Sequence, residues 1–181
     1  MNGRELLIGV TGGIAAYKTA ALVSRLVQAG AGVSVVMTAS ATRLVAPATF
    51  RALTGRPVRT GVFDEPGQPY GAHIGLAEEA DLLCVAPATA NFLAKAAVGI
   101  ADDLLSTLYL SFPGRILAVP AMNNVMWNKP VVQRNVQQLR ADGVHFVGPE
   151  EGWLACRAKG MGRMSNPDTI FDAIEQHLEA K

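Results

Sequence analysis

The sequence predicts a single α/β domain in which helices cover both faces of a parallel β-sheet. Its 181 residues are enough for one domain with a substantial core. Short apolar runs without polar alternation recur along the chain, which is typical of strands buried on both faces. Segments with helical periodicity separate these runs, and this alternation favours a parallel sheet.

The first third of the chain predicts strand, helix, strand and helix. Residues 6–10 form an apolar run that ends at Thr11-Gly12-Gly13. Residues 14–29 place Ala, Leu and Val on one helical face, and glycines end that helix before the apolar strand 33–37. Residues 41–53 are a second helix candidate, which Pro47 interrupts or starts.

The rest of the chain continues the alternation after an expected long loop. Residues 54–72 are rich in Gly, Pro and charge, which is typical of a loop. The apolar runs beyond it predict strands at residues 80–86, 115–119 and 144–147. The periodic segments between and after them predict helices at residues 90–98, 103–111, 130–142 and 168–180.

Composition excludes several classes of protein. Half of the residues are hydrophobic and 17% are charged, yet the uncharged stretches are too short for a membrane span of ~20 residues. The apolar excess therefore indicates contacts between subunits. The formal net charge is +1 with scattered basic residues, which is no nucleic-acid footprint. The start of the chain has no signal-peptide pattern, and two cysteines make no metal cluster or disulfide framework. We expect a cytoplasmic protein without metal.

Four polar or glycine-rich segments follow predicted strands, at residues 11–13, 38–40, 87–91 and 120–124. Parallel sheets bind ligands at the carboxyl ends of their strands, so we expect these segments to form one site. At Gly12-Gly13-Ile14 the backbone amides and the following helix can bind a phosphate. Neither G-x-G-x-x-G nor a Walker pattern is present, which favours a mononucleotide, and Thr38 and Ser40 add hydroxyls. The alternative is a tight turn that merely requires glycine.

The segment Pro120-Ala121-Met122-Asn123-Asn124-Val125-Met126-Trp127 is unusual after a buried strand. Asn123 and Asn124 each bring two donors and an acceptor that need partners when buried. One Asn could cap a helix, since a helix is expected to start near Pro130, but capping explains neither Met. Ligand contact and helix capping are both open interpretations.

His73 stands in Gly71-Ala72-His73-Ile74-Gly75-Leu76, directly after the long loop. An imidazole is suited to proton transfer near neutral pH. A lone His is more often a surface or capping residue, so both interpretations stay open.

Residues 149–166 predict a flexible flap over a ligand. Three glycines give hinge freedom, Trp153 can cover a ligand, and Arg157, Lys159 and Arg163 can meet an anionic substrate. These cations should also favour the thiolate of Cys156. The alternative is a disordered surface loop with an incidental cysteine, in which an exposed Trp and Cys would be a liability.

Together these motifs resemble those of the flavin-dependent cysteine decarboxylases, over nearly the whole chain and in one consistent order. The segments that carry the resemblance are Gly12-Gly13-Ile14-Ala15-Ala16-Tyr17-Lys18, His73-Ile74-Gly75-Leu76, Pro87-Ala88-Thr89-Ala90-Asn91, the Pro120 segment and Ala155-Cys156. The similarity is greatest to the branch that decarboxylates phosphopantothenoylcysteine in coenzyme A biosynthesis.

The resemblance implies a flavodoxin-like (Rossmann-type) subunit that binds FMN. It implies a trimer, or a dodecamer of trimers, with sites at subunit interfaces. His73 would be the base and Cys156 the proton donor, while Asn123 would hold the substrate carboxylate with Ala121 and Met122 beside the flavin. The residues implied to hold FMN are Gly12, Gly13, Ile14, Thr38, Ser40, Thr89, Ala90 and Asn91.

The chain departs from the family pattern at two places, and three rival functions remain. Arg157-Ala158 stands where Gly-Asp usually follows the flap cysteine, and Phe92 replaces a smaller or polar residue. The nearest rival decarboxylates the C-terminal cysteine of a peptide, and enzymes of that kind typically lack the flap cysteine. A flavin prenyltransferase would not use His73 with Asn123. A phosphatase-regulating flavoprotein would carry a long acidic extension, and the sequence ends at Lys181 without one.

Overall fold

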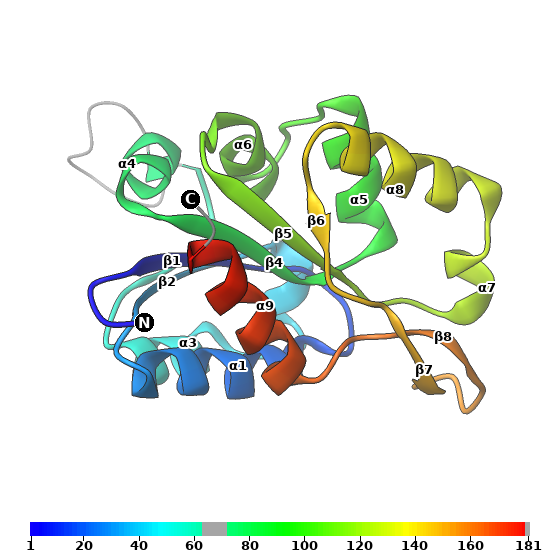
Figure 1. Ribbon diagram of the computed structural model, residues 1–181, viewed down its shortest axis with the longest axis horizontal. Coiled ribbons are helices and arrows are strands. Elements are labelled where there is room, and N and C mark those ends of the chain that lie inside the picture. The colour runs from blue at the N-terminus through cyan, green and yellow to red at the C-terminus, as the bar shows by residue number, and fades with distance from the viewer. Residues whose placement is uncertain (63–71, 180–181) are drawn as a thin grey trace.

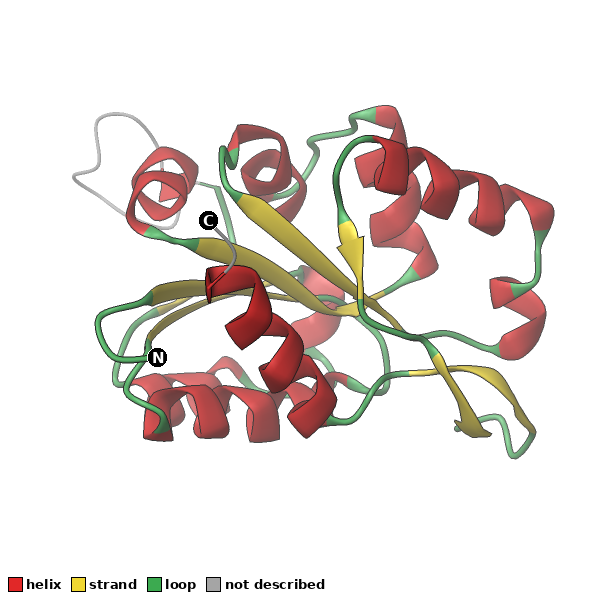
Figure 2. Cartoon of the chain, viewed as in Figure 1, coloured by secondary structure: helices red, strands yellow, loops and turns green. Residues whose placement is uncertain are grey.

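Residues 1–62 and 72–179 are described by a computed structural model, in which a six-stranded sheet lies between two layers of helices (Figures 1 and 2). The predicted α/β class is confirmed, and all strand pairs of this sheet are parallel. The strands are β1 (Glu5–Val10), β2 (Gly32–Met37), β3 (Val58–Arg59), β4 (Leu82–Ala88), β5 (Arg115–Pro120) and β6 (His145–Phe146).

The strand order is β3-β2-β1-β4-β5-β6. Without the two-residue edge strand β3, this is the flavodoxin order 2-1-3-4-5. The chain reverses direction across the sheet between β1 and β4, which makes their carboxyl ends the topological switch point where such folds bind ligands.

Helices α1 (Ala16–Gln28), α3 (Pro47–Thr54) and α9 (Pro167–Glu179) cover one face of the sheet. The other face carries α4 (Ala72–Glu79), α5 (Ala90–Val98), α6 (Leu104–Ser111) and α8 (Pro130–Ala141). Leu6 and Ile8 of β1 face the first layer and Leu7 faces the second, so each layer has its own buried core. Since both faces of the strand are buried, β1 shows no polar alternation.

Several elements differ from the predictions. The helix expected over residues 41–53 is divided into α2 (Ala39–Thr42) and α3, and Pro47 starts the latter at its first turn. The expected long loop contains β3, and α4 begins at Ala72, while residues 63–71 lie outside the described residues. The one-turn helix α7 (Asn124–Trp127) was not predicted.

The predicted flap contains a two-stranded antiparallel hairpin rather than an irregular loop. Its strands are β7 (Glu150–Trp153) and β8 (Lys159–Arg163), which form a separate sheet. Figure 1 shows this hairpin beside α7 at one end of the long axis of the molecule, whereas α4 lies at the other end.

In the described part of the chain, no helix is long and apolar enough to cross a membrane. The same residues contain no group of three or more His, Cys, Asp or Glu side chains that could hold a metal ion.

Candidate functional site

Two adjoining cavities lie at the carboxyl ends of β1, β2, β4 and β5 and form one cleft, because Gly12, Thr89, Ala90 and Met126 line both. Their volumes are about 330 Å³ and about 460 Å³, within the range of small-molecule sites. The larger cavity adjoins Thr38, Ser40 and Asn91. The smaller one adjoins Gly13, Ile14, Ala121, Met122, Asn123 and Cys156. One cleft therefore brings together every predicted site residue except His73.

The turn between β1 and α1 is tied to the end of β4. The hydroxyl of Thr11 donates to the carbonyl of Pro87 at 2.6 Å and accepts from the amide of Thr89 at 3.1 Å. A side chain at Gly12 would overlap the Cβ of Ser40, so the turn fits only with glycine. Close packing at this position explains the glycine without reference to a ligand.

The N-terminus of α1 faces the smaller cavity. Its N-cap, Ala15, gives no side-chain hydrogen bond, although Thr38 and Thr89 cap α2 and α5 through their hydroxyls. Ile14 and Ala15 line the cavity directly before this helix. A 13-residue helix whose N-terminus lacks a side-chain cap offers amide donors and a positive dipole end to an anion.

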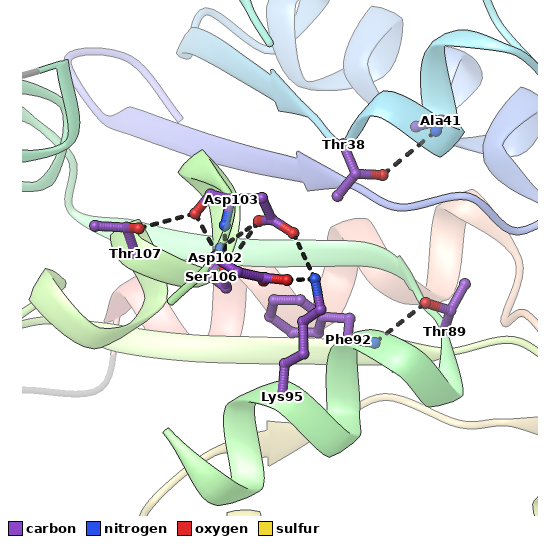
Figure 3. A network of polar contacts seen from close by, with 9 residues as sticks. All are labelled: Thr38, Ala41, Thr89, Phe92, Lys95, Asp102, Asp103, Ser106 and Thr107. Carbon is purple, nitrogen blue, oxygen red and sulfur yellow. Dashed lines mark hydrogen bonds and ion pairs between the residues drawn. The ribbon is translucent and has the colours of Figure 1, made fainter. Parts of the chain in front are cut away.

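The larger cavity contains an ion-pair network that sequence reasoning missed (Figure 3). Lys95 Nζ lies 2.6 Å from a carboxylate oxygen of Asp102 and 3.0 Å from one of Asp103. The hydrogen bond to Asp102 is the main cause that raises the pKa of Lys95. Lys95 is thus paired with two carboxylates, so it stabilises the wall of the larger cavity and offers no unpaired charge to a ligand.

Sequence spacing offers a signal for this network. Lys95 follows Asn91 by four residues and therefore lies on the same helix face. Asp103 caps α6 in a reciprocal capping box with Ser106, a pattern visible at the start of the predicted helix. Burial opposes ionisation of Asp103, but its hydrogen bonds to Ser106 and Lys95 outweigh burial and lower its pKa.

Asn123 both caps a helix and faces the cleft, so its two sequence interpretations are compatible. Its Oδ1 accepts from the amide of Val125 at 2.7 Å and caps α7. Its Nδ2 donates to Sγ of Cys156 at 3.1 Å, across 33 residues of sequence. The side chain of Asn124 instead packs against Gly160 of the hairpin.

The hairpin is docked on this segment through backbone contacts. The amide of Met122 donates to the carbonyl of Gly162 at 3.0 Å. A Cβ at Gly162 would overlap the carbonyl oxygen of Met122, and its φ of +135° also favours glycine. Close backbone approach therefore fixes the hairpin relative to Asn123.

Three charged groups surround the base of the hairpin. Arg163 lines the smaller cavity and donates to Glu150 at 2.8 Å. Lys18 donates to the carbonyl of Met164 at 3.2 Å, and burial, followed by the nearby Arg163, lowers its pKa. Two cations and one carboxylate leave this side of the cleft positive, which suits an anionic ligand.

The hairpin tip carries Cys156 on a tight turn. The amide of Arg157 donates to the carbonyl of Leu154 at 2.9 Å, and the amide of Leu154 donates to the carbonyl of Ala158 at 2.9 Å. Arg157 has a φ of 61°, in the left-handed region where the resembled pattern has glycine. The departure noted in the sequence thus falls on the strained position of the turn.

We expect Arg157→Gly to stabilise the closed turn by about 1 kcal/mol, because glycine adopts this conformation without a Cβ clash. Hydrogen exchange at the Leu154 amide should slow about fivefold, since that amide closes the turn. Arg157→Ala is the control, because it removes the charge and keeps the Cβ. Equal slowing in both variants would assign the effect to charge and contradict the backbone argument.

His73 is not part of this cleft within one chain. It lies in the first turn of α4, at the end of the molecule opposite the hairpin (Figure 1). Its Nδ1 is buried and has no hydrogen-bond partner among the described residues. The chain therefore does not bring His73 together with Asn123 and Cys156.

Comparison with known proteins identifies the family. The family model described as flavoprotein matches residues 1–179. The chain belongs to the flavoprotein family. This confirms the family resemblance found in the motifs.

Among relatives of the flavoprotein, the coenzyme A biosynthesis bifunctional protein CoaBC of Bacillus subtilis is 48% identical over 178 residues. The match covers 98% of this chain and 44% of that protein. CoaBC of Haemophilus influenzae is 40% identical, with 100% and 45% covered. The chain thus spans less than half the length of these curated relatives.

Two solved structures are similar over nearly their whole length. The FMN-dependent cysteine decarboxylase SpaF has a TM-score of 0.84 and 38% identity, with 97% of this chain and 95% of SpaF covered. A PPC decarboxylase variant complexed with pantothenoylaminoethenethiol has a TM-score of 0.87 and 27% identity, with 98% and 99% covered. The fold of this flavoprotein is therefore that of flavin-dependent decarboxylases.

Proposed function

We propose that this chain is an FMN-dependent carboxy-lyase that converts 4′-phosphopantothenoylcysteine to 4′-phosphopantetheine in coenzyme A biosynthesis. The observation that carries the proposal is the contact between the amide of Asn123 and the thiol of Cys156 in a cleft at the switch point of the sheet. The relatives named for coenzyme A biosynthesis and the similarity to PPC decarboxylase support this choice.

The cleft fits FMN in shape and in donor chemistry. The N-terminus of α1, which has no side-chain cap, suits a phosphate, with the amides around Gly12, Gly13 and Ile14 as donors. The hydroxyls of Thr38 and Thr89 accept helix amides and keep their own hydrogens free to donate. Ser40, Ala90 and Asn91 line the same cleft and complete the proposed cofactor site.

His73 enters the proposed site from a second copy of the chain. Within one chain His73 lines neither cavity of the cleft, and its buried Nδ1 has no hydrogen-bond partner among the described residues. Large apolar side chains beside the cleft are exposed, including Ile14 at 61%, Tyr17 at 63% and Val125 at 60%, and a subunit interface would bury them. A trimer, alone or as the unit of a dodecamer, is the assembly that the resemblance implies.

The reaction requires an electron sink, because loss of CO2 from a cysteine carboxyl would otherwise leave an unstabilised carbanion. FMN, held by the amides around Gly12, Gly13 and Ile14, would supply a two-electron acceptor for the transient oxidation of the substrate's thiol carbon to a thioaldehyde. His73 takes the proton released in the oxidation, while Asn123 holds the carboxylate. Loss of CO2 then places the electron pair in an enethiolate, and Cys156 gives its proton to the substrate carbon.

The hairpin is the proposed substrate flap, within residues 149–166 of a single decarboxylase domain. Its cations and the positive base of the cleft match a substrate that carries a phosphate and a carboxylate. A cytoplasmic location is part of the proposal, because both cysteines are free thiols, as expected in a reducing compartment.

The test supplies the purified protein with FMN and then with two substrates in separate reactions. We expect a yellow protein with FMN stoichiometric to subunits, and turnover of phosphopantothenoylcysteine. A peptide ending in cysteine serves as the comparison, because decarboxylation of a C-terminal peptide cysteine is the nearest rival function. Exclusive turnover of the peptide would replace the proposed substrate, and a protein that stays colourless with FMN would contradict every flavin function.

A further inference from the structure

The orientation of the Asn123 amide is fixed by the helix that it caps. Its Oδ1 accepts from the amide of Val125 at 2.7 Å. An inverted amide would set Nδ2–H against that N–H, donor against donor. Nδ2 must therefore face Cys156, and since this nitrogen can only donate, Sγ is the acceptor at 3.1 Å.

The backbone around this contact holds the two side chains in register. The amide of Met122 donates to the carbonyl of Gly162, and Gly160 packs against the Asn124 side chain. In each contact one partner is a sequence neighbour of Asn123, and the other belongs to the flap strand β8. The contact between Asn123 and Cys156 is thus set by the docking of the hairpin, not by a free surface side chain.

We propose that Asn123 is also a positioning residue for the proton donor, because its Nδ2–H stabilises the thiolate that Cys156 becomes. This inference rests on the proposed function. When the S–H bond of Cys156 breaks and a C–H bond forms on the substrate carbon, the electron pair stays on sulfur. A hydrogen bond to a charged acceptor is stronger than one to a neutral acceptor, so Nδ2–H favours this state.

The amide nitrogen has two N–H groups, which lets Asn123 perform both roles in one geometry. One N–H binds Sγ of Cys156, and the other is available to the substrate carboxylate. Departure of CO2 frees the second donor and leaves the first in place for the proton transfer. Asn123 therefore links the group that leaves to the group that delivers the proton.

The test measures alkylation of Cys156 by iodoacetamide near neutral pH, in the whole protein without substrate. Cys84 does not interfere, because it is buried and burial raises its pKa to about 12. Asn123→Asp keeps the capping oxygen and replaces the donor by an acceptor, and Asn123→Ser keeps a capping oxygen on a side chain too short to reach Sγ. Both variants should slow alkylation about threefold or more, since higher intrinsic nucleophilicity offsets part of the lost thiolate.

Asn124→Asp is the matched control, because it adds the same charge one residue away, and it should leave the rate near that of the unaltered protein. A merely structural role would undock the flap, expose Cys156 further and speed alkylation. Unchanged or faster alkylation in Asn123→Ser would overturn the inference, as would slowing in Asn123→Asp alone. The readout needs no turnover, so a protein that fails to decarboxylate would contradict the proposed function without touching this result.

Discussion

Replacing His73 with alanine is expected to abolish release of CO2 from phosphopantothenoylcysteine, with a loss of about 10³-fold or more, while FMN stays bound. The imidazole is the proposed base for oxidation of the substrate, and no other step can begin without it. His73 lines neither cavity of the cofactor cleft in its own chain, so that cleft should remain intact. Bound flavin, measured by absorbance, and CO2 release together check both parts of this expectation.

Co-expression of His73→Ala with Cys156→Ser tests whether neighbouring subunits share each site. If His73 acts across an interface, about a quarter of the sites in a random mixture combine an intact His73 with an intact Cys156. Each variant alone should form little 4′-phosphopantetheine, and the mixed assembly should recover part of its formation. Inactive mixed assemblies would contradict a shared site and would mean that His73 acts in the cleft of its own chain.

Cys156→Ser is expected to lower the yield of 4′-phosphopantetheine by about 100-fold or more, without preventing decarboxylation. The hydroxyl of serine is a much weaker acid than a thiol, so the proton does not reach the substrate carbon. The reaction should stop at an enethiol with FMN reduced, visible as bleaching of the flavin absorbance. The mass of the accumulated product identifies the stalled species.

Met161→Leu is a suitable control for this variant. Met161 is an exposed flap residue, 40% accessible, and leucine keeps its apolar surface. It should turn over normally and leave the flavin oxidised after each cycle. Full activity of Cys156→Ser, on the other hand, would remove Cys156 from the proton-donor role.

Much of the fold could be predicted because local sequence and tertiary packing agree. The strands of the sheet centre are continuous apolar runs since both faces are buried, and β4 is buried through all seven residues. The predicted helix at residues 90–98 matches α5, which Thr89 caps and Gly99 ends with a left-handed φ of 75°. α4 was missed because its sequence, AHIGLAEE, has no clear apolar stripe and follows a loop-like stretch.

The candidate site was predictable where it follows strand ends, since the parallel topology brings those ends together. Asn123 was harder to interpret, because capping and ligand contact compete as explanations in the sequence. The structure shows that its Oδ1 caps α7 while its Nδ2 donates to Cys156. Lys95 was missed because its carboxylate partners come from the start of another helix. The placement of His73 depends on how chains assemble, which spacing within one chain does not encode.

The most direct test of the proposed function is an aerobic reaction of the purified protein with phosphopantothenoylcysteine, without added reductant, followed by mass. The proposed cycle oxidises and then reduces the substrate, so it predicts many turnovers per FMN and a product that has lost CO2 alone. That product is 4′-phosphopantetheine. Accumulation of a product that has also lost two hydrogens, or no reaction of the FMN-loaded protein, would contradict the proposed function.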